Sequence, residues 1–389
     1  MASTDALREL APESYPEAAE MLRQAADGGD GVQIHGGATK LGWGRALREP
    51  FRRLSTGRLD RVIEHNQGDF TAIVQAGVRL DELQQRLRAS GQRVSLDPPT
   101  GDGRATIGGI AATADAGPLR HRYGTPRDLI LGITVALPDG TLAKSGGKVI
   151  KNVAGYDLGK LYAGSFGTLG PILQVALRLH PLPAETATVV GRSDDPGRIA
   201  EAALGLARAP LEPEALDVRW AEGEGALLIR VTGSAAERLA ARAQALMAER
   251  GLRTEVADEA AAAWAVQRDG QRAADGAVVR VSSTASRLAE VVEAVRERDA
   301  SLVGRAAAGV SWITLPGADD ERLAAEVEAL RRRLAPAQCA VFDMPESLRA
   351  GFDVWGFDSP GEQRLMAAIK ERFDPGRRCN PGLFGDPVG

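Results

Sequence analysis

Glycine clusters alternate with short apolar runs over residues 98–179. Glycine weakens strands, so a strand-rich segment tolerates it where the backbone turns sharply or closely approaches another group. This pattern predicts a sheet whose glycine turns lie against a large ligand, and a dinucleotide with its pyrophosphate is the natural candidate. The clusters are Pro98–Gly101, Thr106–Gly109, Tyr123–Gly124, Gly155–Leu158 and Gly164–Gly170.

Together with the segments before it, this region predicts an N-terminal domain over residues 1–183, with subdomains at about 1–95 and 96–183. Apolar periodicity predicts a helix, three strands and a second helix before residue 95. Between residues 129 and 144, two apolar runs flank Pro138-Asp139-Gly140, which predicts a β-hairpin. The expected early elements are a helix at 16–27, strands at 32–34, 61–64 and 71–76, and a helix at 81–90.

Residues 184–335 predict a second domain of a different kind, a cap or substrate domain. Helices rich in Ala, Arg and Glu alternate there with strands, which favours a ferredoxin-like domain with two helices on one antiparallel sheet. Ser234 and Glu237 have the spacing of a capping box before a helix. The tail, 336–389, contains a predicted helix at 364–372. The expected fold class is therefore α+β.

Composition and charge exclude several classes of protein. The 389 residues carry a net charge of −4, which argues against binding to nucleic acid or to an anionic membrane through bulk charge. The start of the chain is unlike a signal peptide and no apolar run is long enough to span a membrane, so we expect a cytoplasmic protein. Two cysteines and four scattered histidines favour reduced thiols and no metal site or iron–sulfur cluster.

Three familiar signatures fail on their spacing. Gly42-Trp43-Gly44 lacks the third glycine of G-x-G-x-x-G, and Val149 replaces the Ser or Thr that a P-loop needs. Residues 163–167 resemble a nucleophile elbow, but a glycine turn and a strand follow instead of a helix. The sequence therefore predicts neither a Rossmann site, nor a P-loop, nor a catalytic serine.

The loop Gly36-Gly37-Ala38-Thr39-Lys40 follows a predicted strand, so its N–H groups suit phosphate oxygens. An ordinary turn is the alternative. A basic middle region suits an anionic cofactor or an α-hydroxy carboxylate, although a solvated face would explain any single cation. This region contains Arg120, Arg122, Arg127, Lys148 and Lys151. The catalytic candidates are His121, Lys151 and Tyr156, and an exposed loop histidine is the alternative for His121.

The ordered set of motifs, from Gly36-Gly37 to Asn380-Pro381-Gly382, resembles the FAD-binding domain of the vanillyl-alcohol oxidase/p-cresol methylhydroxylase family. The string Lys151–Leu158 narrows the resemblance to the FAD-binding subunits of bacterial glycolate oxidase (glycolate dehydrogenase). The family implies FAD held between two subdomains, a cap, and a tail that folds back. By position it implies FAD contacts at Gly36, Gly37, Ala38, Thr39, Lys40, Pro98, Thr106, Gly108, Gly109, Gly117, Gly124, Asp128, Gly155, Gly167, Ile172 and Asn380.

Two departures from the family shape the expected function. Ala38 stands where members with covalent flavin carry histidine, so we expect non-covalent FAD. No histidine follows His180, whereas related 2-hydroxy acid dehydrogenases have a histidine cluster there. We expect glycolate oxidation to glyoxylate within a complex that contains a second flavin subunit and an iron–sulfur subunit, with membrane attachment only through those partners. The alternatives are a stand-alone FAD oxidoreductase and a flavin-holding subunit without a substrate site.

Overall fold

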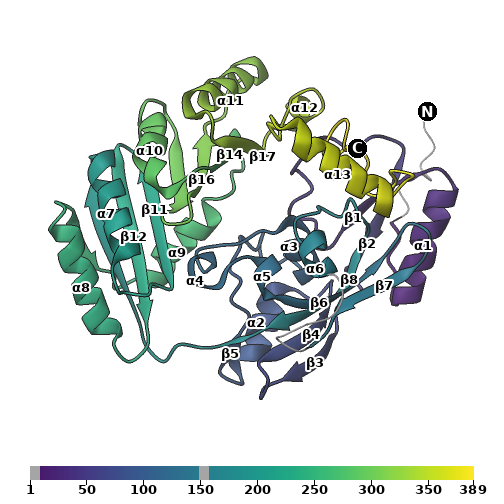
Figure 1. Ribbon diagram of the computed structural model, residues 1–389, viewed down its shortest axis with the longest axis horizontal. Coiled ribbons are helices and arrows are strands. Elements are labelled where there is room, and N and C mark those ends of the chain that lie inside the picture. The colour runs from purple at the N-terminus through teal and green to yellow at the C-terminus, as the bar shows by residue number, and fades with distance from the viewer. Residues whose placement is uncertain (1–8, 149–156) are drawn as a thin grey trace.

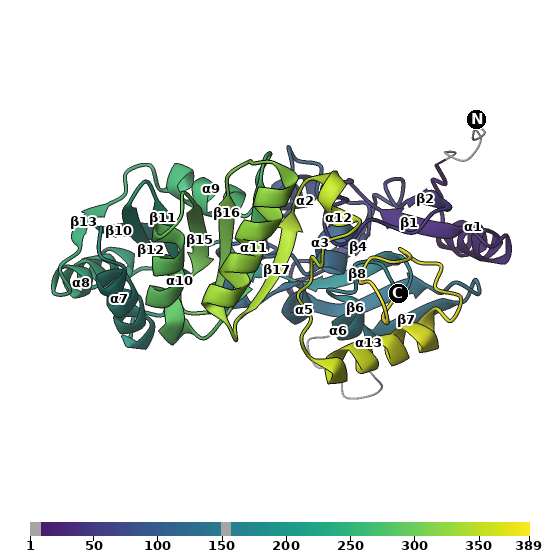
Figure 2. The same cartoon turned by 90° about the horizontal axis from the view of Figure 1, so that it is seen from above.

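The computed structural model describes residues 9–148 and 157–389, which form two parts side by side (Figures 1 and 2). The N-terminal part contains a five-stranded sheet and two small two-stranded sheets. The second part, the cap, is residues 186–343 and contains one eight-stranded sheet. This mixture of helices and largely antiparallel sheets confirms the predicted α+β fold class.

The chain begins with a helix packed on a parallel pair of strands. Ser14 caps this helix, and its buried alanines and Leu22 pack against Val32 and Leu54 of the strands. The pair is parallel, with Gly31 opposite Phe51 and His35 opposite Ser55. These elements are α1 (Tyr15–Asp27), β1 (Gly31–His35) and β2 (Phe51–Ser55).

The five-stranded sheet is antiparallel, in the order β3-β4-β8-β6-β7. The β6–β7 pairing confirms the predicted hairpin. Helices α2 and α3 contribute Leu83, Leu87 and Ile110 to the core on this sheet. The elements of this region are β3 (Val62–Asn66), β4 (Thr71–Gln75), α2 (Leu80–Arg88), β5 (Gln92–Arg93), α3 (Ile107–Thr113), α4 (Arg120–Tyr123), α5 (Pro126–Leu129), β6 (Ile130–Ala136), β7 (Leu142–Gly146), α6 (Leu158–Tyr162), β8 (Ile172–Arg178) and β9 (His180–Pro181).

The cap consists of two βαββαβ units whose sheets join between β11 and β15. Each unit has ferredoxin-like connectivity, whereas the sequence analysis predicts a single ferredoxin-like domain in this region. Its elements are β10 (Thr186–Ser193), α7 (Pro196–Arg208), β11 (Ala215–Ala221), β12 (Glu224–Thr232), α8 (Ala236–Ala248), β13 (Arg253–Val256), α9 (Ala260–Asp269), β14 (Ala277–Ser282), α10 (Leu288–Arg296), β15 (Ser301–Arg305), β16 (Val310–Leu315), α11 (Asp320–Leu334) and β17 (Gln338–Asp343).

The two faces of the cap sheet differ. Helices α7, α8, α10 and α11 share one large apolar core on the outer face. On the opposite face, which we call the inner face, Trp264 of α9 packs against Val190 and Leu228. Helix α4 of the N-terminal part contacts β11. The boundary between the two parts is therefore lined by strands of the cap.

Three details differ from the sequence expectations. The Thr106–Gly109 cluster begins helix α3, because the Thr106 hydroxyl accepts a hydrogen bond from Gly109 N–H and caps that helix. The Ser234–Glu237 capping box does not form, since α8 begins after Ala235 without a side-chain cap. The cap sheet also continues past the expected boundary at residue 335, because β17 pairs with β14.

The tail returns to the N-terminal part through α12 (Glu346–Arg349) and α13 (Pro360–Phe373). Figure 2 shows α13 beside α6, where Phe373 packs against Tyr162 and, with Ile369, against the core of the five-stranded sheet. Cys339 and Cys379 are free and buried. Among the helices formed by residues 9–148 and 157–389, none is both long enough and apolar enough to cross a membrane.

Candidate functional site

The loop that follows β1 forms a small nest of backbone N–H groups. Ala38 has φ 56°, in the left-handed region, whereas its neighbours Gly37 and Thr39 are not among the residues with positive φ. Within the described residues, no acceptor takes a hydrogen bond from the N–H groups of residues 37–40. Successive free N–H groups in such a turn attract an anion, and the pyrophosphate of a dinucleotide is the anion that the loop suits.

Close packing explains the paired glycines in this loop. A Cβ on Gly37 would lie 1.7 Å from the Arg104 carbonyl oxygen, and one on Gly36 would lie 2.1 Å from Thr106 Oγ1. The close neighbour at these two positions is therefore the polypeptide before α3. Because glycine has no Cβ, the loop can pack directly against that segment. The turn that results leaves the N–H groups of the loop without acceptors among the described residues.

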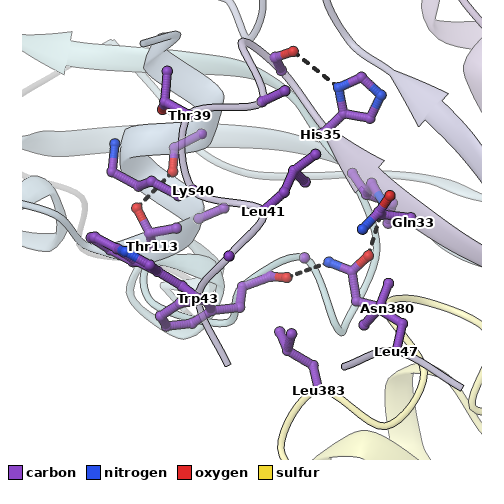
Figure 3. A pocket seen from close by; sticks show the side chains of 18 of the residues that line it. Gln33, His35, Thr39, Lys40, Leu41, Trp43, Leu47, Thr113, Asn380 and Leu383 are labelled. Carbon is purple, nitrogen blue, oxygen red and sulfur yellow. Dashed lines mark hydrogen bonds between the residues drawn. The ribbon is translucent and has the colours of Figure 1, made fainter. Parts of the chain in front are cut away.

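A cavity of about 510 Å³ opens beside the nest (Figure 3). This volume lies within the range of ligand pockets, roughly 300–1,000 Å³. Segments that are far apart in sequence line the cavity. They include the loop after β1, the stretch from Arg45 to Thr56, the start of α3, the turn at Phe166–Gly167, the segment from Met344 to Arg349, and the tail at Asn380 and Leu383. The cavity thus lies where the N-terminal part and the returning tail meet.

Most of the predicted FAD contacts come together here. The cavity is lined by Gly36, Gly37, Ala38, Thr39, Lys40, Thr106, Gly108, Gly109, Gly167, Ile172 and Asn380. Pro98, Gly117, Gly124 and Asp128 lie outside its lining. Gly155, Lys151 and Tyr156 lie outside the described residues.

Three of the outlying residues have roles within the chain. A Cβ on Gly117 would lie 1.8 Å from the Asp97 carbonyl oxygen, so this glycine allows two segments to touch. Gly124 has φ 79° and precedes α5, where Asp128 and Thr125 form a capping box. These contacts stabilise the turn before β6.

The predicted basic region does not form one cluster. Lys148 pairs with Glu64 at 2.9 Å on the surface, and Arg122 and Arg127 are exposed. His121 does not line the cavity, and burial lowers its pKa. In the part of the chain that the structure describes, no group of three His, Cys, Asp or Glu side chains could hold a metal ion.

The cap contacts the nest loop through residues that sequence reasoning missed. The Arg272 guanidinium donates to Thr39 O at 2.9 Å and pairs with Asp343 at 2.7 Å. Trp43 Nε1 donates to the same Asp343 carboxylate at 3.0 Å. The two contacts to the N-terminal part, Arg272–Thr39 and Trp43–Asp343, join positions more than two hundred residues apart, so no local pattern could have revealed them.

A buried ion pair lies beneath Trp43. Lys40 Nζ is 3.2 Å from Asp115, and their side chains are 7% and 4% exposed. The same ammonium is 5.6 Å from the centre of the Trp43 ring, close enough for a cation–π interaction. Lys40 therefore contacts both the cavity wall and the interior between the two parts.

The tail closes the cavity through Asn380. Its Oδ1 accepts the Ile34 N–H at 2.8 Å, and its Nδ2 donates to Phe166 O at 2.6 Å (Figure 3). Lys370, which is fully buried, supports this arrangement by donating to Asp374, Thr168 O and Cys379 O at 2.7–2.9 Å. The structure thus shows Asn380 holding two walls of the cavity together.

His35 has local partners. Its Nδ1 lies 3.1 Å from Gly36 O, and its Nε2 lies 2.9 Å from Glu9. Ala38 supplies no ring nitrogen in the loop. The free N–H groups and apolar walls suit a dinucleotide that is held by hydrogen bonds and packing, and they fit FAD in chemistry and position.

Comparison with known proteins identifies the N-terminal part. Residues 7–146 match the model of an FAD binding domain. Over 179 residues, the chain is 34% identical to mitochondrial D-lactate dehydrogenase [cytochrome] of Arabidopsis thaliana, covering 46% of this chain and 31% of that protein. Over 164 residues, it is 30% identical to glycolate oxidase subunit GlcE of Escherichia coli, covering 42% and 46%. The chain thus covers less than half the length of these two relatives.

The fold also resembles solved structures. An alkyldihydroxyacetonephosphate synthase superposes on 96% of this chain and 76% of its own, with a TM-score of 0.70 and 16% identity. This likeness concerns the fold alone. The match of residues 7–146, the sequence relatives and the nest beside its cavity together show that this part of the chain is an FAD-binding domain. It is related to those of FAD-linked oxidoreductases of the glycolate oxidase/D-lactate dehydrogenase group, and the cofactor is FAD.

Proposed function

We propose that the chain is the FAD-binding subunit of a 2-hydroxy acid dehydrogenase complex that oxidises glycolate to glyoxylate. The observation that carries this proposal is the nest of free N–H groups at residues 37–40 beside a cavity closed by Asn380. The likeness to glycolate oxidase subunit GlcE supports the choice of substrate.

The proposed reaction removes two electrons and two protons from the CH–OH group of the substrate, and bound FAD supplies the two-electron acceptor. The nest at residues 37–40 would hold the pyrophosphate. Thr106 and Gly108–Gly109 would line the cofactor from the side of α3, and Gly167 and Ile172 from the opposite side. Since Ala38 follows the paired glycines, we propose that FAD is bound without a covalent link.

Partner subunits form the second half of the proposal. No histidine follows His180, and the chain has only two cysteines. We propose that a second flavin subunit and an iron–sulfur subunit accept the electrons. The complex would be cytoplasmic, and attached to the inner membrane only through those partners.

The decisive experiment uses purified chain, alone and co-purified with its partners from the native host. We expect yellow protein that releases free FAD on acid precipitation, which also tests for a non-covalent link. Anaerobic glycolate should bleach the flavin in the complex, whereas acetate, which lacks the hydroxyl group, should leave it oxidised. Protein that takes up no FAD, or a complex whose flavin glycolate leaves oxidised, would overturn the proposal.

The same assay separates the two alternatives. Steady turnover of glycolate or another hydroxy acid by the isolated chain would favour a stand-alone oxidoreductase. Flavin in this chain that stays oxidised, while the partner's flavin bleaches, would favour a subunit that holds flavin without a substrate site.

A further inference from the structure

Two arginines from the later part of the chain hold the outer side of the nest loop. Arg272, which follows α9 of the cap, donates to Thr39 O at 2.9 Å. Arg349 of α12, in the tail, donates from Nη1 to Leu41 O at 3.1 Å. Both arginines lie far beyond residues 7–146, which match the FAD-binding domain. The loop is therefore held by parts of the chain outside the domain that contains it.

These two contacts orient N–H groups on the other side of the loop. A trans peptide is planar, so its N–H points away from its C=O. The carbonyls of Thr39 and Leu41 point to the arginines, and the N–H groups of Lys40 and Gly42 therefore point the opposite way. Neither N–H has an acceptor among the described residues, and both residues line the cofactor cavity. The arginines thus leave two oriented donors for a ligand.

The two arginines differ in how their charges are balanced. Arg272 forms an ion pair with Asp343 at 2.7 Å. Arg349 forms no ion pair with any described residue, although Glu49 and Glu346 line the same cavity. Arg349 therefore places an unpaired positive charge in the wall of the cofactor cavity.

Arg349 also has a buried donor that no atom of the described residues satisfies. Its Nε is buried and without a hydrogen-bond acceptor there, whereas its Nη1 is occupied by Leu41 O. A buried donor without an acceptor is unfavourable, so Nε indicates a missing partner, an anion or a water molecule. The side of a guanidinium that carries Nε suits a phosphate oxygen, because its N–H donors are fixed in one plane and charged.

We propose that Arg349 is a binding residue for the pyrophosphate of FAD. Its free guanidinium edge would donate to a phosphate oxygen, while Nη1 holds the loop whose N–H groups bind the same pyrophosphate. Helix α12 of the tail thereby completes a cofactor site that the FAD-binding domain begins. This proposal rests on the cofactor alone, so the identity of the substrate and the existence of partner subunits do not affect it.

The test titrates full-length apoprotein with FAD at several salt concentrations and follows flavin fluorescence. The pyrophosphate carries the negative charge of FAD, so a contact with Arg349 should make part of the affinity sensitive to salt. Arg349→Gln keeps a donor and removes the charge. It should weaken FAD binding by about ten- to a hundredfold and reduce its salt dependence. Arg349→Lys keeps the charge and should recover part of the affinity together with the salt dependence. Arg364→Gln, at an exposed arginine of α13 outside the cavity lining, is the matched control.

Riboflavin, which has the flavin ring but no phosphate, separates a phosphate contact from a change in the shape of the cavity. Arg349→Gln should bind riboflavin as the wild-type protein does. The proposal is overturned if Arg349→Gln binds FAD like wild type, or if its affinity for riboflavin falls by the same factor as its affinity for FAD. It is also overturned if Arg349→Gln and Arg349→Lys lose equal affinity for FAD and both keep the wild-type salt dependence, because Arg349 would then act through its contact with Leu41 alone.

Discussion

The Asn380 side chain offers the sharpest test of how the tail shapes the cofactor cavity. It is 7% exposed and makes two hydrogen bonds, to Ile34 N–H and to Phe166 O. Its backbone has φ 43°, which favours Asn or Gly. Asn380→Gly therefore removes both bonds without backbone strain. Each of the two buried groups left without a partner costs about 1–3 kcal/mol, so the free energy of unfolding should fall by about 2–6 kcal/mol.

Part of this loss should appear in cofactor affinity, because Ile34 and Phe166 both line the cavity. Every 1.4 kcal/mol of coupling corresponds to about tenfold in Kd. We expect Asn380→Gly to bind FAD at least about tenfold more weakly, as measured by flavin fluorescence on titration of apoprotein. Asn380→Asp keeps the acceptor for Ile34 and loses the donor to Phe166, so its effect should be intermediate.

Asn66→Gly is the matched control for this prediction. In the described part of the chain, the Asn66 side chain bonds only to the neighbouring Asp69 on the exposed β3–β4 hairpin. Its substitution should leave FAD affinity unchanged and cost little stability. If Asn380→Gly retains both the stability and the FAD affinity of wild type, the two hydrogen bonds do not hold the cavity together and the reasoning is wrong.

Three further predictions concern packing and charge. Gly37→Ala should lower the free energy of unfolding by about 3 kcal/mol or more, because the added Cβ would clash with Arg104 O. Urea denaturation measures this change, with Gly351→Ala as the control because a Cβ on Gly351 has no neighbour within 4 Å. Equal losses of stability in the two variants would contradict the prediction. Lys370→Met should lower the free energy of unfolding by about 3–5 kcal/mol, since it leaves the buried Asp374 carboxylate without its cation. A variant with the urea midpoint of the wild-type protein would contradict this prediction. The pKa of Asp97 is raised from 3.8 to about 7, so the folded state holds that proton more tightly and stability should fall as pH rises from about 4 to about 7. Asp97→Asn should reduce this slope by at most about 1.4 kcal/mol per pH unit, and an unchanged slope would refute the assignment.

Local patterns predicted the elements that local forces determine. Apolar runs located β4 and β6, and the turn at Pro138–Gly140 correctly indicated the β6–β7 hairpin. Strand β2 was missed because Arg52 and Arg53 interrupt its apolar run, and its pairing with β1 depends on chain that returns from a distance. Its parallel partner could not be inferred from that stretch of sequence.

The site followed the same division. The nest loop was located from sequence because it is a short motif, whereas the Thr106–Gly109 cluster was expected to be a turn and instead begins α3. The Arg272 contact to Thr39 spans 233 residues and the Asn380 contact to Ile34 spans 346, so neither leaves a local signal. Sequence grouped Arg120 with Arg122 and Arg127, which the structure leaves exposed.

The glycines carry a more general lesson about close approach. Their density predicted backbone that lies against a large ligand, yet at Gly36 and Gly37 the close neighbours are Thr106 and Arg104 of the same chain. Contact between these two segments leaves the N–H groups of residues 37–40 without hydrogen-bond partners among residues 9–148 and 157–389. Glycine thus acts one step before the ligand: it lets two segments of chain touch, and their contact forces the turn that presents the anion-binding groups. A side chain at Gly37 should therefore disrupt the wall of the cavity even where it never reaches the cofactor.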